Sequence, residues 1–135
     1  MALKVEGVCP LLWVFDMPKA IAFYRDLLGF EIVSTDRPGN ECDWALLRLN
    51  DTEIMLNTLY DRGERPANPD PARVNAHGDT TLYFGCRDVD AAYRHLRLAG
   101  LDVKEPVIRD YGMKQLGLKD PDGYGLCFQW RAAQA

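Results

Sequence analysis

The sequence predicts an α+β protein made of two tandem β-α-β-β-β modules, whose strands form a half-open, barrel-like sheet around a central cleft. Three observations lead to this prediction. The chain repeats itself, each copy places a helical segment between short apolar runs, and 135 residues suffice for one domain with a buried core. We expect a single domain over residues 1–135, with a first module at about 7–60, a linker at about 61–77 and a second module at about 78–131.

The repeat is visible when VCPLLWVFDMPKAIAFYRDLLGFEIV is set beside TTLYFGCRDVDAAYRHLRLAGLDVK. Each copy is an apolar run that ends in aspartate, followed by a helical pattern, a glycine and an extended stretch. Asp16 corresponds to Asp88 and Gly29 to Gly100, and LRLND later in the first copy corresponds to LGLKD in the second. The two halves therefore follow one plan.

Each copy predicts the same elements in the same order. A helix is expected between Asp16 and Gly29 and another between Asp88 and Gly100, because aspartate is a preferred N-cap and glycine ends helices in the left-handed conformation. The segment TLYDRGERPANPDPARVNAHG between the copies is polar and holds three prolines, so we expect a loop there. The short apolar runs predict strands over about 8–15, 30–35, 42–49 and 53–57 and over about 79–86, 102–109, 113–119 and 124–130.

Composition excludes several classes of function. Apolar residues make up 47% of the chain and charged residues 27%, as in ordinary globular domains. Sixteen basic against twenty acidic residues give a net charge of -4, which disfavours nucleic acid as a partner. No apolar stretch is long enough to span a membrane, and the N-terminal residues lack a signal-peptide cleavage pattern. We expect a cytoplasmic protein with four reduced, mostly buried thiols, those of Cys9, Cys42, Cys86 and Cys127.

The predicted cleft follows from the alternation of side chains along a strand. One parity of the first, fourth, fifth and eighth strands is uniformly apolar (Leu12, Val14, Ile54, Leu56, Leu82, Phe84, Leu126 and Phe128) and is expected to face the helices. The opposite parity, with Trp44 and Arg48 of the third strand, should line a pocket for an aromatic ligand, and tyrosines at strand ends should form its rim. The expected ligand-binding residues are Cys9, Leu11, Trp13, Trp44, Arg48, Glu53, Met55, Asn57, Thr81, Tyr83, Tyr111, Cys127 and Gln129, with Tyr60 and Tyr124 as further rim candidates.

The strings VFDMPKAIAFYRDLLGFEIV, CRDVDAAYRHLRLAGLDV and LKDPDGYGLCFQW resemble the vicinal oxygen chelate superfamily of glyoxalases, extradiol dioxygenases and bleomycin-resistance proteins. The resemblance covers nearly the whole chain and is closest in character to the bleomycin-resistance branch. It implies paired β-α-β-β-β modules, a homodimer and a small-molecule ligand in a concave cleft.

The same resemblance indicates where a metal would be bound. Metal-dependent members carry His, Gln or Glu early on the first strand and on the fourth strand of each module. Thiol, thioether and hydroxyl groups form a poor set for Mg, Mn, Fe or Ni, so we expect no metal and no cofactor. The residues at the four corresponding positions here are Cys9, Met55, Thr81 and Cys127.

Three functions remain open at this point. The first is metal-free sequestration of a small, aromatic or cationic molecule. The second is an enzyme of the glyoxalase or dioxygenase type. It would hold a metal through shifted ligands such as His77, Glu53 and Gln129, or use Glu53, the best catalytic candidate, for metal-free acid/base chemistry. The third is an interaction module whose cleft is filled by side chains. Arg48 is expected to pair either with an anionic group of the ligand or with Glu53.

Overall fold

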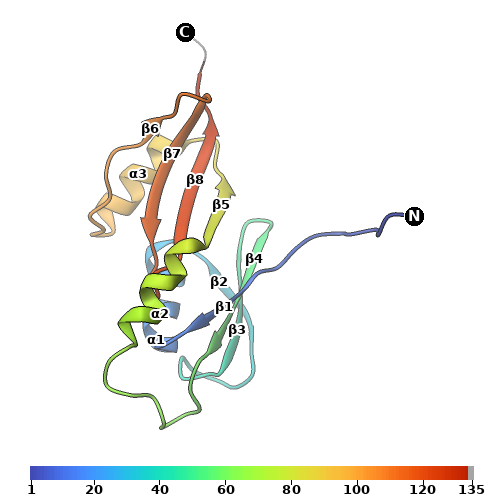
Figure 1. Ribbon diagram of the computed structural model, residues 1–135, viewed down its shortest axis with the longest axis vertical. Coiled ribbons are helices and arrows are strands. Elements are labelled where there is room, and N and C mark those ends of the chain that lie inside the picture. Colours follow the sequence, from blue (N-terminus) through green and yellow to red (C-terminus); the bar gives the residue numbers. More distant parts are fainter. Residues whose placement is uncertain (134–135) are drawn as a thin grey trace. The chain divides into compact units, whose positions relative to one another are not determined.

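The structure is a computed structural model of the chain, and it describes residues 1–133. The chain forms two compact units, the first over Met1–Ala67 and the second beginning at Asn68. Figure 1 shows the helices and strands of both units. None of the helices among the described residues is long and apolar enough to cross a membrane.

The first unit is a four-stranded mixed sheet with one helical segment. Its strands lie in the order β1-β4-β3-β2, with β1 parallel to β4 and the other neighbours antiparallel. The helical segment follows β1 and contacts β4. The elements are β1 (Leu11–Val14), α1 (Met17–Ile21) with its π-helical continuation η1 (Ala22–Leu27), β2 (Glu31–Thr35), β3 (Trp44–Leu49) and β4 (Thr52–Thr58).

The second unit repeats this plan. Its strand order, β5-β8-β7-β6, matches that of the first sheet position by position, and α3 contacts β7 and β8. The predicted pair of β-α-β-β-β modules is therefore confirmed. The elements are α2 (Pro71–Ala76), the 3-10 turn η2 (His77–Asp79), β5 (Thr81–Gly85), α3 (Val89–Leu98), β6 (Val107–Ile108), β7 (Met113–Lys119) and β8 (Gly125–Arg131).

The helix ends confirm the predicted caps. Asp16 accepts a hydrogen bond from the backbone N–H of Lys19 at 3.1 Å, and Asp88 accepts one from Ala91 at 2.9 Å. Gly29 and Gly100 have φ angles of 95° and 93°, in the left-handed region where glycine is favoured. The first helical segment differs from a regular α-helix because its second half widens into η1.

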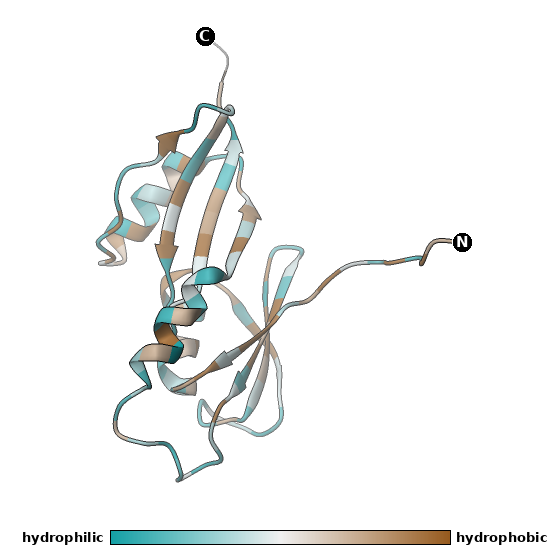
Figure 2. Cartoon of the chain, viewed as in Figure 1, coloured by the Kyte–Doolittle hydropathy of each residue, from teal (hydrophilic) through white to brown (hydrophobic). Residues whose placement is uncertain are grey.

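The core of each unit lies on the strand parity that the sequence predicts. In the first unit, Leu12, Val14, Ile54 and Leu56 are at most 3% exposed. In the second, Leu126 and Phe128 are buried, whereas Leu82 and Phe84 of β5 are only half-buried. The alternation of hydrophobic and hydrophilic residues is visible along the strands in Figure 2. Each sheet consequently has one apolar face toward its helix and one open face.

The first and sixth strands fall furthest short of their predicted lengths, and proline explains both differences. The first strand begins at Leu11, not near residue 8, because Pro10 has no N–H to donate, although its carbonyl accepts a bond from Met55 at 2.8 Å. The sixth strand covers only Val107–Ile108, not 102–109, because Pro106 precedes it.

The segment between the repeats corrects another expectation. It was predicted to be a loop throughout, but Pro71–Ala76 forms α2. Asp70 caps this helix by accepting a hydrogen bond from the N–H of Ala72 at 3.0 Å, and Pro71 occupies the first turn. Proline is well suited to the first position of a helix because the N–H that it lacks would have no backbone partner within the helix. The prolines thus mark a helix start as well as a loop.

Candidate functional site

The open face of the first sheet carries a row of two tryptophans with an amide between them. Trp13 of β1 and Trp44 of β3 both pair with Asn57 of β4, so the three side chains stand side by side on one face. The backbone at Trp44 is anchored because Asp36 accepts hydrogen bonds from the N–H groups of Trp44 and Asp43, at 2.9 and 2.8 Å. These bonds, chiefly the one from Trp44, hold the pKa of Asp36 below its usual value. The neighbouring row consists of Leu11, Met55 and Leu46.

An ion pair lies at the opposite end of this face from the two tryptophans. Arg48 donates through Nε and Nη2 to Glu53 Oε2, at 3.1 and 2.7 Å. Burial raises the pKa of the nearby Cys9 thiol, and the charge of Glu53 adds to this effect. Of the two pairings considered for Arg48, the structure shows the one with Glu53. The carboxylate of Glu53, the candidate for acid/base chemistry, is therefore already held by a guanidinium.

The open face of the second sheet holds a groove with a volume of about 400 Å³. Two rows of side chains cross its floor from β5 over β8 to β7. Glycine occupies one position in each row, which leaves bare backbone beside the longer side chains. The rows are Thr81, Gly125 and Lys119, and then Tyr83, Cys127 and Gly117.

A polar network borders this groove. Gln115 Oε1 accepts hydrogen bonds from Arg109 Nε at 3.1 Å and from the Tyr111 hydroxyl at 3.2 Å. Gln115 Nε2 donates to Gln129 Oε1 at 2.9 Å. Tyr111 and Gln129 were anticipated, whereas Arg109, Gln115 and Lys119 were missed. Gln115 and Lys119 could have been predicted, because Gln115, Gly117 and Lys119 alternate with leucines in KQLGLK.

Cys127 lies on the open face by register but is only 7% exposed. Burial raises the pKa of its thiol, and the positive charge of Arg109 opposes this shift. The thiol is therefore protonated at neutral pH and adds no negative charge to the groove. All four cysteines are free.

Two aromatic residues expected at the rim lie elsewhere. Tyr124 is 7% exposed and stacks on His77, with 4.1 Å between the ring centroids. His77 Nδ1 lies 2.7 Å from the backbone oxygen of Asp122, so it must donate, and Nε2 lies 3.3 Å from the Tyr124 hydroxyl. Both ring nitrogens of His77 are engaged within the second unit. Tyr60 packs edge-on against Phe15 and lines a different cavity.

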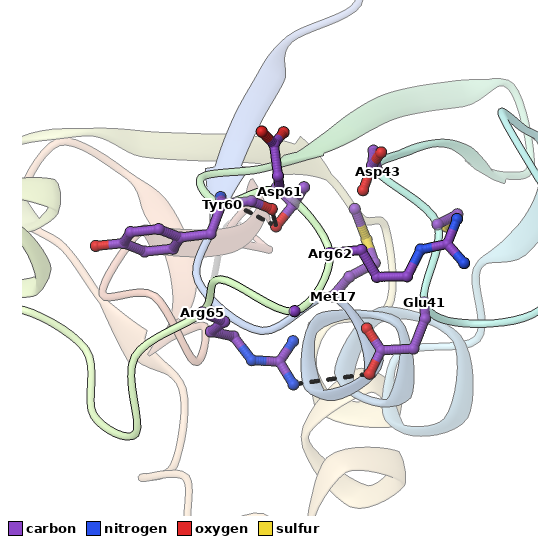
Figure 3. A pocket seen from close by; sticks show the side chains of 10 residues that line it. Met17, Glu41, Asp43, Tyr60, Asp61, Arg62 and Arg65 are labelled. Carbon is purple, nitrogen blue, oxygen red and sulfur yellow. Dashed lines mark hydrogen bonds and ion pairs between the residues drawn. The ribbon is translucent and has the colours of Figure 1, made fainter.

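This other cavity, of about 220 Å³, lies in the first unit beside the start of α1 and was not anticipated (Figure 3). Its floor includes Met17. Three of its charged groups, Glu41, Asp43 and Arg65, take part in ion pairs. Arg65 lies 3.7 Å from carboxylate oxygens of both Asp16 and Glu41, and Asp43 accepts a bond from Arg37 at 2.6 Å.

The residues at the four positions that the resemblance indicates for metal ligands do not fit a hard divalent ion. The side chains there are the thiols of Cys9 and Cys127, the thioether of Met55 and the hydroxyl of Thr81. In the part of the chain that the structure describes, no three His, Cys, Asp or Glu side chains come together in a way that would hold a metal.

Comparisons with known proteins agree with this architecture. Residues 8–128 match the model of the glyoxalase/bleomycin resistance protein/dioxygenase superfamily. A bleomycin resistance protein of Geobacillus stearothermophilus is 29% identical over 126 residues, which are 88% of this chain and 92% of that protein. The solved structure of SMU.1112c is 31% identical, with a TM-score of 0.71 over 94% of this chain and 100% of that one. A bleomycin-binding protein solved with bleomycin has the same TM-score at 20% identity, over 96% of this chain and 100% of that one.

Proposed function

Because the chain belongs to the glyoxalase/bleomycin resistance protein/dioxygenase superfamily, we propose that it binds a small aromatic molecule on the open faces of its sheets, without a metal ion, and sequesters it unchanged. The similarity to proteins named for bleomycin resistance and bleomycin binding supports this proposal. Superfamily membership alone fixes the scaffold and not the ligand, so the argument depends on the residues of the open faces.

The row formed by Trp13, Asn57 and Trp44 carries the proposal. Neighbouring strands are about 4.8 Å apart, so the two tryptophan backbones are separated by roughly 9.6 Å across β4. Indole rings that rise from positions this far apart leave room for a flat ring between them. The side-chain amide of Asn57 lies at the bottom of this space and offers both a donor and an acceptor. Stacking with a hydrogen bond beneath is a suitable arrangement for a planar heteroaromatic ligand.

Sequestration needs shape, stacking and hydrogen bonds, but no side chain with a tuned pKa. The groups on the open faces fit that requirement better than they fit acid/base catalysis. Glu53 is bonded twice to Arg48, and the thiol of Cys127 is protonated. His77, considered as a shifted metal ligand, bonds instead to Asp122 and Tyr124.

We also propose a cytoplasmic homodimer. The dimer is supported by the exposure of large side chains on the open faces, with Leu11, Trp13 and Tyr83 between 39% and 61% exposed. Monomeric proteins rarely leave extended apolar patches uncovered, and a second copy of the chain would shield part of these faces.

We expect the Trp13→Ala and Trp44→Ala variants each to weaken the binding of 2-naphthamide, a neutral planar probe, by about twofold to tenfold. The physical reason is the loss of one stacking surface. Isothermal titration calorimetry measures the affinities, and thermal unfolding verifies that each variant is folded. For the wild type, a probe at a hundred times its Kd should add about 2.7 kcal/mol to the free energy of unfolding.

The matched control is Trp130→Ala. Trp130 lies on the helix side of the second sheet, with the Arg87 guanidinium 4.5 Å from the centre of its ring, and its loss should leave the affinity unchanged. Bleomycin serves as a second probe because the chain is similar to a bleomycin resistance protein and to a bleomycin-binding protein. The proposal fails if neither probe stabilises the wild type, or if the Trp13 and Trp44 variants bind 2-naphthamide as tightly as the wild type does.

A further inference from the structure

The groove on the second sheet has a positive charge that the chain as a whole does not have. Its lining includes two basic side chains, Arg109 and Lys119, and no carboxylate among the described residues. The whole chain has a net charge of -4, so the positive charge of the groove is a local feature. A cleft lined by one sign of charge concentrates ligands of the opposite sign.

Both cations are available to a ligand. Arg109 uses Nε to bond Gln115, which fixes the guanidinium plane and leaves its two terminal nitrogens for another acceptor. Lys119 Nζ lies close to Gly78, since a Cβ placed on Gly78 would be 3.4 Å from this nitrogen. Within residues 1–133, neither Arg109 nor Lys119 takes part in an ion pair.

The two charges stand at opposite ends of a flat, uncharged floor. Arg109 is tied to Gln115, and Lys119 follows four residues later on the same face of β7, roughly 14 Å along the strand. Gly117 and the protonated Cys127 lie between these ends. Tyr83, which is 61% exposed, pairs with Cys127 and presents its ring beside this floor.

We propose that this groove binds a planar molecule that carries a carboxylate or a phosphate group, with the ring on the floor beside Tyr83 and the anion held by Arg109 or Lys119. The fork of N–H groups on a guanidinium matches either anion, and an ammonium group attracts both. This inference rests on the proposed function, because it assumes that the open faces bind a small molecule. It specifies the sign of the ligand's charge, and it selects an anion over the cationic ligand that the sequence also left open.

Four naphthalene probes that differ in one substituent test the inference: 2-naphthoate, 2-naphthyl phosphate, 2-naphthamide and 2-naphthylmethylammonium. Calorimetry at low salt should show that at least one anionic probe binds about tenfold more tightly than the amide, and that the ammonium binds most weakly. At least one of the Lys119→Met and Arg109→Met variants, the one that removes the side chain holding the anion, should weaken anion binding by about threefold to tenfold and leave amide binding unchanged. The ratio of the two anionic affinities distinguishes a carboxylate site from a phosphate site.

The matched controls, Lys104→Met and Arg94→Met, remove one positive charge from exposed positions outside the groove. They change the net charge equally and should leave the preference for anions intact. If all four probes bind with equal affinity, or if the groove variants keep the wild-type preference, the anion site is refuted while small-molecule binding stands. If neither these four probes nor bleomycin binds, the proposed function and this inference are both wrong.

Discussion

The Leu56→Ala substitution should lower the free energy of unfolding by about 3 kcal/mol, within the range of about 2–5 kcal/mol for leucine in a protein core. Leu56 has no solvent exposure and lies in β4, a central strand of the first sheet. It pairs with Leu12 on one side and Ala45 on the other, both of them buried. Truncation would leave a cavity that neighbours fixed in strands cannot fill. Urea denaturation followed by circular dichroism measures the change.

Met55→Ala is the control from the adjacent position. Met55 lies on the open face and is only half-buried, so its truncation should cost less than about 1 kcal/mol. It should instead weaken the binding of 2-naphthamide, because Met55 lies in the row beside Trp13 and Trp44. An equal loss of stability in the two variants would mean that the strand register is wrong, since a shift by one residue exchanges the two faces.

The second large effect is expected at Gly123, in the turn between β7 and β8. We expect Gly123→Ala to cost about 3–4 kcal/mol. Its φ angle is 90°, which disfavours alanine, and the added Cβ would collide with the backbone oxygen of Val74 in α2. Relief of this clash requires α2 to move and so weakens the contacts that His77 makes with Asp122 and Tyr124. Thermal and urea unfolding measure the loss.

Gly112→Ala separates the two causes. Gly112 has nearly the same φ angle, 88°, but nothing lies within 4 Å of the position that its Cβ would occupy. This variant should therefore show only the conformational cost of about 1–2 kcal/mol. Equal losses at both glycines would contradict the tight packing of α2 on the β7–β8 turn.

Much of the fold was predictable because the relevant signals are local and occur twice. The aspartate caps and glycine ends fix both helices, and alternation of side chains fixes the buried face, as Leu12, Ile54 and Leu126 show. The duplication also provides a test of each prediction, since a wrong assignment in one copy would disagree with the assignment in the other. The helix at Pro71–Ala76 was missed because it belongs to neither copy and its prolines are typical of loops as well as of helix starts.

The candidate site was only partly predictable. Strand parity gave the rows that contain Trp13, Asn57 and Cys127. It did not give Arg109, which follows the two-residue strand β6 and reaches the groove through its bond to Gln115. That position depends on where a short strand ends and which way a turn bends. A long basic side chain beyond a strand end therefore needs the structure before it can be assigned to a site.

Side-chain NMR signals of the isotope-labelled protein test the central claim, that the open sheet faces bind a small molecule, most directly. During titration with 2-naphthoate, we expect shifts in the indole N–H signals of Trp13 and Trp44 and in the amide signals of Gln115 and Gln129. The indole signal of Trp130, on the helix side of its sheet, should stay unchanged. A shift at Trp130 without any shift at the open-face side chains would contradict the claim.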